Sequence, residues 1–292
     1  MKIAIVIVTY NGMKWLKKCL TSVYQSDISV NVIVVDNNSQ DGTIDFIKEN
    51  FKQIHLIATG KNLGFGKANN IGMRKALENG ADYLYLLNQD AYLESSTLSE
   101  LVRFSEKNSN YGILSPMQYN GDGTALDPNF KQNLPFKNDS KDDSIIDVEF
   151  VMAAHWLLTR ECILQVGLFD PIFKHYGEDN DYINRALYHG YRVGVVQTAK
   201  GLHDRFFRKI PVKRKLEIYY RSNLSVLTNI NLSFSGAVKV FLKKMIPVFG
   251  KSILKLRILE IRTHTGQMIN CIWLLPKIID SRKENKKEFK IF

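Results

Sequence analysis

Cysteine is scarce in this sequence, and none of the cysteines is paired by spacing. There are three in 292 residues, Cys19, Cys162 and Cys271, and they are far apart with no C-x-x-C pair among them. This pattern speaks against a disulfide framework and against a cysteine-based zinc site. We therefore expect reduced thiols, which are typical of a cytoplasmic protein.

We expect neither an export signal nor a membrane-spanning segment in this sequence. Lys2 is followed at once by an alternating strand pattern, with no small-residue cleavage site, so we expect no signal peptide. An uncharged stretch of the last third spans residues 263–276. It falls short of the roughly 18 residues that a membrane span needs.

The glycine motifs of common nucleotide-binding proteins are missing as well. Gly64 and Gly66 fit the start of a G-x-G-x-x-G motif, but Asn69 stands where its third glycine belongs. No P-loop lysine motif is present either. Glycine at these positions still permits close approach of the backbone to a ligand.

Positive charge is abundant but uneven. The net charge is +11, and residues 206–292 alone hold 19 Lys and Arg against 5 Asp and Glu, a net charge of +14. The preceding 205 residues have a net charge of −3. Such a division suggests that the basic part meets an anionic surface, either a membrane or a nucleic acid.

Residues 1–90 alternate between strand and helix patterns. Apolar, β-branched runs predict strands at residues 3–8, 32–35, 54–58 and 83–87, each followed by a helical pattern. Four such repeats predict an α/β fold with a Rossmann-like, mainly parallel sheet flanked by helices. Further on, the pattern favours helices at 98–104, 160–166 and 179–189, and a last strand at 191–196.

Two later segments have a different character. Residues 117–147 are rich in Asn, Asp, Gly, Lys and Pro, and predict a long loop that closes over a site. From about residue 206, helical spacing of apolar residues alternates with lysines, and Pro247 and Gly250 are expected to break the helix. We predict a domain at residues 1–205 and a basic, mainly helical extension at 206–292.

Polar side chains follow two of the predicted strands. The triplet Asn88-Gln89-Asp90 ends the fourth strand, and Asp36-Asn37 ends the second. The carboxyl edge of such sheets is where ligands bind, and carboxylates there can hold a divalent cation against phosphates. An Asp or Asn at this edge can also pair with a pyrimidine ring. A polar turn or a helix-capping Asx-turn is the structural alternative.

A second acidic cluster lies at Glu178, Asp179 and Asp181, followed by His203. A carboxylate there could take a proton from an acceptor hydroxyl, and His203 could complete a metal site. The alternatives are N-capping of a helix by acidic residues and a structural histidine.

The order of these motifs is more specific than any one of them. Between residue 3 and about residue 205 the chain reads Thr-Tyr-Asn-Gly, Asp-Asn-Asn-Ser, Asn-Leu-Gly-Phe-Gly, Asn-Gln-Asp, Gly-Leu-Phe-Asp, Tyr-Gly-Glu-Asp-Asn-Asp, Gly-Tyr-Arg-Val and a final His. This resembles the family 2 inverting glycosyltransferases with the GT-A fold. Within them it looks most like bacterial rhamnosyltransferases of surface-polysaccharide assembly.

The resemblance implies roles for particular residues. Asp179 matches the catalytic base, while Asp90 and His203 match the ligands of Mg²⁺ or Mn²⁺. The positions that match the nucleotide-sugar contacts are Thr9, Tyr10, Asn11, Asp36, Asn37, Asn62, Gly66, Asn69 and Asn88.

The resemblance also implies partners. The implied donor is a nucleotide diphosphate-sugar, dTDP-rhamnose or a UDP-sugar, and the acceptor a glycan or lipid-linked saccharide. The basic extension would then hold the enzyme on the anionic inner face of the cytoplasmic membrane, and a homodimer through this extension stays open.

Two positions depart from the family pattern. The metal triplet begins with Asn88 rather than Asp, which leaves Asp90 as its only charged ligand. His155 and Trp156 follow Ala153-Ala154 where relatives usually carry Gly-Ala and then Met. We expect this bulky pair to lie near the sugar, against either the donor or the acceptor.

Two other functions fit parts of the sequence. A sugar-nucleotide pyrophosphorylase shares the nucleotide fold, but it should carry a Gly-rich loop with Arg and Lys after the first strand, which residues 9–12 lack. A non-catalytic nucleic-acid-binding protein would use the basic extension. We favour the glycosyltransferase and predict no nucleic-acid partner.

Overall fold

The computed structural model describes residues 1–135, 142–205 and 211–288. Its helices are α1 Met13–Tyr24, α2 Thr43–Asn50, α3 Phe65–Glu78, α4 Thr97–Lys107, α5 Pro128–Asn133, α6 Arg160–Val166, α7 Glu178–Tyr188, α8 Val212–Thr228, α9 Phe234–Leu254 and α10 Ile258–Glu284. Its strands are β1 Ile3–Thr9, β2 Asn31–Asp36, β3 His55–Ala58, β4 Tyr83–Asn88, β5 Ala91–Leu93, β6 Tyr111–Asn120, β7 Ile145–Asp147, β8 His155–Thr159 and β9 Arg192–His203.

The strands form one mixed sheet in the order β3-β2-β1-β4-β8-β6-β9-β5, with β7 also paired to β9. Strands β1 to β4 pair in parallel, as the repeats of residues 1–90 predict. Beyond them β8 inserts antiparallel between β4 and β6, and β5 and β7 pair antiparallel with β9. The predicted α/β class is confirmed, and the later strands add the antiparallel pairings.

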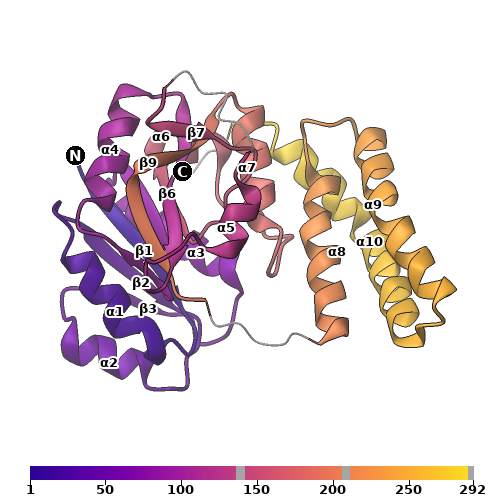
Figure 1. The fold of residues 1–292 in the computed structure, drawn as a ribbon, viewed down its shortest axis with the longest axis horizontal. Coiled ribbons are helices and arrows are strands. Elements are labelled where there is room, and N and C mark those ends of the chain that lie inside the picture. The colour runs from indigo at the N-terminus through magenta and orange to yellow at the C-terminus, as the bar shows by residue number, and fades with distance from the viewer. Residues whose placement is uncertain (136–141, 206–210, 289–292) are drawn as a thin grey trace.

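Helices cover both faces of the sheet (Figure 1). Strand β1 is apolar at every position from Ile3 to Val8, and its side chains alternate between two buried clusters. Helices α1, α2 and α4 pack on one face, and α3, α6 and α7 pack on the other. Helix α1 forms because Leu16, Cys19, Leu20 and Val23 recur at helical spacing and are all buried.

Helices α8, α9 and α10 form a separate helical unit beside the sheet (Figure 1). Their apolar residues make a third cluster around Tyr220, Phe241, Met245 and Ile278. Within the described parts of the chain, no helix is long and apolar enough to cross a membrane.

The long loop predicted at residues 117–147 is interrupted by regular elements. Strand β6 runs on to Asn120, α5 begins where Asp127 caps it, and β7 follows at Ile145–Asp147. The Asp127 side chain accepts from the backbone N–H groups of Asn129 and Phe130, which is strong N-capping. Residues 136–141 of the predicted loop lie outside the described residues.

The predicted break at Pro247 and Gly250 was also wrong. Helix α9 continues through both residues. Proline removes one backbone hydrogen bond from a helix, but the buried side chains of Phe241 and Met245 hold the preceding turns against α8 and α10. Tertiary packing therefore outweighs the local preference here.

Candidate active site

A cavity of about 720 Å³ opens at the carboxyl edge of β1, β2 and β4. Parallel strands end at the same edge, so the polar residues that follow them gather there. The lining residues are Val8, Tyr10, Asn37, Lys61, Asn62, Leu63, Gly64, Phe65, Lys67, Asn88, Gln89, Asp90, Lys174, His175 and Arg214.

The triplet after β4 forms part of the cavity wall. Gln89, its middle residue, accepts a hydrogen bond from the backbone N–H of Tyr10 at 2.8 Å and donates one to the Tyr10 carbonyl at 3.2 Å. A side chain at Gly12 would collide with Gln89, because a Cβ there would lie 2.5 Å from Oε1. Gln89 therefore joins the loops after β1 and β4, and leaves Asn88 and Asp90 to face the cavity.

Asp90 and His203 come together across two strands. Pairing of β5 with β9 sets Ala91 opposite His203, and the Asp204 N–H donates to the Asp90 carbonyl at 2.8 Å. The Nε2 atom of His203 lies 3.5 Å from Oδ1 of Asp90. This separation suits two ligands of one cation, since each ligand atom stands at about 2.1 Å from such an ion.

The other ring nitrogen of His203 has no hydrogen-bond partner although it is buried. Its nearest acidic neighbour, Asp127, lies 4.0 Å away and forms an ion pair with Arg205 at 2.6 Å. Among the described residues, no group of three or more His, Cys, Asp and Glu is arranged to hold a metal ion. The protein donors therefore fit a cation only as a partial set, one carboxylate and one imidazole, which a bound diphosphate would have to complete.

The carboxylate at the end of β2 is held by its neighbours. Asp36 is fully buried and accepts from the Thr9 hydroxyl at 2.9 Å, the Ser39 hydroxyl at 2.6 Å and the Ser39 N–H at 2.9 Å. Three bonds to a carboxylate leave about one acceptor position free. The arrangement fixes the loops that follow β1 and β2 against each other.

Asn37 and Asn62 shape the loop on the opposite wall. The Asn37 side chain donates to Oδ1 of Asn62 at 3.0 Å and accepts from the Leu63 N–H at 2.7 Å. Gly64 follows with φ of 83°, and a Cβ there would lie 2.0 Å from the carbonyl oxygen of Lys174. Only glycine allows this approach, which brings the segment before α7 to the cavity.

The predicted site residues fall into three groups. Tyr10, Asn37, Asn62, Asn88 and Asp90 line the cavity. His203 lines an adjoining cavity of about 430 Å³, and Asp179 is half-buried at the start of α7. The remaining predicted residues, which support the walls or lie behind them, are Thr9, Asn11, Asp36, Gly66 and Asn69.

Two carboxylates begin α7. Burial, and next the charge of Asp179, raise the pKa of Glu178 to about 8. One oxygen of Glu178 is buried without a partner, and the other lies 3.9 Å from Nδ1 of His175, which lines the cavity. Burial also raises the pKa of Asp179, opposed by hydrogen bonds from Asn180. The pair thus favours one proton on Glu178 and the negative charge on Asp179.

The sequence reasoning missed the cations of the cavity. Lys61, Lys67, Lys174 and Arg214 all line it. Arg214 comes from the first turn of α8, and its guanidinium lies 6.0 Å from the centre of the Tyr176 ring. The excess of lysine and arginine in the sequence hinted at an anionic ligand, but only the fold shows that α8 reaches this cavity.

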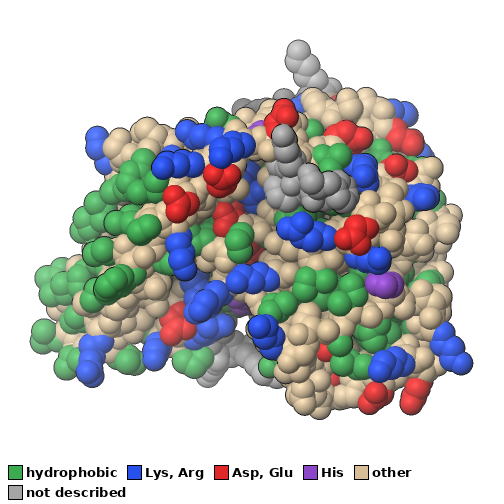
Figure 2. All heavy atoms as spheres, turned by 180° about the vertical axis from the view of Figure 1, so that it is seen from behind, with side chains coloured by type: hydrophobic (Ala, Val, Ile, Leu, Met, Phe, Trp, Pro, Cys, Tyr) green, Lys and Arg blue, Asp and Glu red, His purple; other side chains and the backbone are tan. Residues whose placement is uncertain are grey.

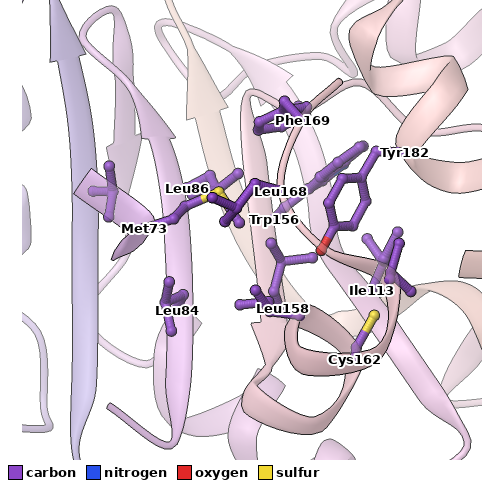
Figure 3. Close-up of a cluster of buried hydrophobic side chains, with 14 of the residues drawn as sticks. Met73, Leu84, Leu86, Ile113, Trp156, Leu158, Cys162, Leu168, Phe169 and Tyr182 are labelled. Carbon is purple, nitrogen blue, oxygen red and sulfur yellow. The ribbon is translucent and has the colours of Figure 1, made fainter. Parts of the chain in front are cut away.

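The expectation that His155 and Trp156 lie near the sugar was wrong. Both are fully buried, and Trp156 packs among Leu168, Phe169 and Tyr182 (Figure 3). His155 lies between the Tyr85 hydroxyl at 2.8 Å and the Leu202 carbonyl at 3.0 Å. Burial lowers its pKa to about 3, so it stays neutral. Successive side chains of β8 point to opposite faces of the sheet, and both faces are buried there.

The chain belongs to glycosyl transferase family 2. The pattern of that family matches residues 4–166, which is more than half of the chain. The chain is therefore a glycosyltransferase, as predicted, and neither a pyrophosphorylase nor a non-catalytic nucleic-acid-binding protein.

Individual relatives include rhamnosyltransferases. The dTDP-rhamnosyl transferase RfbF of Shigella flexneri is 27% identical over 239 residues, which cover 74% of this chain and 76% of RfbF. The N-acetylglucosaminyl-diphospho-decaprenol L-rhamnosyltransferase of Mycobacterium tuberculosis is 24% identical, over 69% of this chain and 75% of its own. Both belong to the predicted group of relatives.

Solved structures share the fold at low sequence identity. The TarS fragment 1–349 of S. aureus in complex with UDP-GlcNAc matches with a TM-score of 0.65 at 15% identity, over 98% of this chain and 88% of its own. GalNAc-T7 with UDP, GalNAc and Mn²⁺ matches with a TM-score of 0.62 at 15% identity, over 82% of this chain and 50% of the GalNAc-T7 chain. The GT-A fold predicted from the sequence is thereby confirmed.

Proposed function

We propose that this enzyme is an inverting, metal-assisted rhamnosyltransferase that uses dTDP-rhamnose. The observation that carries the proposal is the cavity that Asp90 and four cationic side chains line, with His175 of the same cavity 3.9 Å from Glu178 at the start of α7. Its cations suit the two phosphates of a nucleotide diphosphate-sugar. The choice of sugar rests on the rhamnosyltransferases among the relatives, and a UDP-sugar is the second candidate.

Asp179 is proposed as the catalytic base. It takes the proton of an acceptor hydroxyl as that oxygen bonds to the anomeric carbon, while the bond from this carbon to the diphosphate oxygen breaks on the opposite face. The nucleoside diphosphate leaves with the electron pair of that bond. Glu178 is the less suitable base near neutral pH, because its pKa of about 8 keeps it protonated.

Asp90 and His203 are proposed to hold the Mg²⁺ or Mn²⁺ ion together with the donor diphosphate. Such an ion would stabilise the negative charge that develops on the leaving diphosphate. Lys61, Lys67, Lys174 and Arg214 supply positive charge to the same region. Because Asn88 is neutral, we expect metal affinity to depend strongly on bound diphosphate.

We further propose that the acceptor is a lipid-linked glycan at the inner face of the cytoplasmic membrane. Residues 206–292 would hold the enzyme there, and residues 1–205 would act as the catalytic domain. The net charge of +14 in the former segment favours anionic lipid, at about 1 kcal/mol for each Lys or Arg near the surface.

Thermal unfolding with a panel of nucleotides tests the donor. A ligand that binds only the folded enzyme raises its Tm. We expect dTDP and dTDP-rhamnose to raise Tm more with Mn²⁺ than without it, and more than UDP or UDP-GlcNAc. A larger shift with the UDP series would replace dTDP-rhamnose as the donor.

A further inference from the structure

The turn between α9 and α10 presents large apolar side chains to solvent. Leu254 is 87% exposed, Leu256 82%, Ile258 70% and Leu259 59%. Figure 2 shows hydrophobic side chains gathered over the outer part of the helical unit, with Lys and Arg among them. Isolated exposed leucines are ordinary, but a contiguous group at the tip of a helix pair marks a contact surface.

Basic side chains alternate with these apolar ones. Lys251, Lys255, Arg257 and Arg262 lie in the same segment, and Glu260 is its one acidic residue. The Glu260 carboxylate accepts from Arg257 at 3.0 Å and from the Ser252 hydroxyl at 2.7 Å, so its charge is matched. The tip therefore combines an apolar surface with an excess of positive charge, which complements an anionic bilayer.

The tip is rigidly attached to the rest of the helical unit. His264, fully buried on α10, lies 3.2 Å from the Tyr220 hydroxyl of α8 and 3.3 Å from the Ser252 hydroxyl of α9. Proline-free turns of α10 continue directly from the tip to this contact. The apolar side chains thus project from a fixed platform.

The tip lies at the same end of the helical unit as Arg214, which lines the cavity. Helices α8 and α10 run in the same direction, since Tyr220 contacts His264 and Leu227 accepts from Arg282. Arg214 precedes Tyr220 by six residues, and Ile258 precedes His264 by six, which is about 9 Å in each helix. In Figure 1 the first turn of α8 and the α9–α10 turn accordingly lie at the same, lower end.

We propose that residues 253–259 form a membrane-insertion tip. The side chains of Leu254, Leu256, Ile258 and Leu259 enter the apolar layer of a bilayer, and the neighbouring Lys and Arg contact anionic headgroups. The insertion tip rests on the proposed membrane-bound acceptor. Insertion of the tip would bring the part of the cavity near Arg214 to the headgroup region. A second copy of the chain is the less suitable partner, because a two-fold contact at the tip would bring like charges together.

Vesicle flotation of the whole enzyme tests the tip. The double variant Leu254→Asn/Leu256→Asn should bind phosphatidylglycerol-containing vesicles at least about tenfold more weakly than the wild type. The matched control Ile269→Asn/Ile272→Asn removes two exposed apolar side chains from the middle of α10, away from the tip. It should bind within about twofold of the wild type. Equal losses in both variants, or none in either, would overturn the insertion tip.

Two further measurements separate the explanations. At equal protein concentration, sedimentation should show the same mass for the wild type and the tip variant; a wild-type dimer that the tip substitutions dissociate would assign the tip to self-association instead. Donor hydrolysis in vesicle-free buffer should be unchanged in the tip variant. If the wild type lacks this hydrolysis, the proposed function fails, while the vesicle result still decides the tip.

Discussion

The Nε2 atom of His203 lies 3.5 Å from the Oδ1 atom of Asp90, although the two residues are more than 100 positions apart in the sequence. Their contact depends on the antiparallel pairing of β5 with β9. The sheet thus brings a carboxylate and an imidazole together beside the cavity that we propose as the donor site.

Removing Asp90 should abolish the effect of metal on diphosphate binding. We expect the affinity of Asp90→Ala for dTDP to be the same with and without Mn²⁺, because Asp90 is the only charged residue of its triplet. His203→Ala should lose less of the metal effect, since an imidazole ligand supplies no negative charge to the cation. Titration calorimetry measures both, and a wild-type metal dependence in Asp90→Ala would remove the triplet from the mechanism.

Asp179→Asn should lower kcat at least about 100-fold and leave the Kd for donor nearly unchanged. The amide keeps the shape of the side chain but cannot accept the acceptor proton. Glu178→Gln is the matched comparison, and it should retain far more activity near neutral pH. If Glu178→Gln were the inactive variant and Asp179→Asn the active one, the base would be Glu178.

The pKa of Glu178 makes a separate prediction about stability. Between its unfolded value near 4.5 and its folded value of about 8, the carboxyl is ionised when unfolded but protonated when folded. Its contribution to the stability of the wild type is therefore complete below pH 4.5 and is lost as pH rises to 8, at up to about 1.4 kcal/mol per pH unit.

Glu178→Gln removes this titration. Its free energy of unfolding, relative to that of the wild type, should therefore rise from pH 5 to pH 8 and stay level above. Urea unfolding of both proteins at several pH values measures the difference. A difference that does not change with pH would show that Glu178 ionises normally in the folded enzyme.

Arg214→Ala should weaken binding of dTDP about tenfold, because a cation within reach of a phosphate is worth about 1.4 kcal/mol or more. Lys215→Ala is the control. It removes one positive charge at the next position of α8, and the Lys215 side chain does not line the cavity. The affinity for thymidine, which has no phosphate, should be equal in both variants. Equal Kd values for dTDP in Arg214→Ala and Lys215→Ala would exclude α8 from the donor site.

The first part of the fold was predictable because its signals are local. The apolar run from Ile3 to Val8 and the acidic triplet after Leu87 mark a buried strand and its carboxyl end without reference to the rest of the chain. The order of β5 to β9 within the sheet was not predictable in this way, because β8 separates β4 from β6 only through pairings between distant segments.

The same distinction holds for the site. Asp90 and Asp179 could be proposed from motif order and family resemblance. The place of Arg214 in the cavity wall could not, because it depends on how α8 packs against α7. His155 and Trp156 were misplaced because their chemistry suggested a ligand, while their position in β8 buries both side chains.

Turnover of the donor tests the central claim most directly. The purified enzyme is incubated with Mn²⁺ and, separately, with dTDP-rhamnose, UDP-GlcNAc and UDP-glucose, and release of nucleoside diphosphate is measured for the wild type and for Asp179→Asn. We predict release of dTDP from dTDP-rhamnose by the wild type, at least about 100-fold less by Asp179→Asn, and little release from the UDP-sugars. Preferential cleavage of a UDP-sugar, or equal rates in the wild type and Asp179→Asn, would contradict the account.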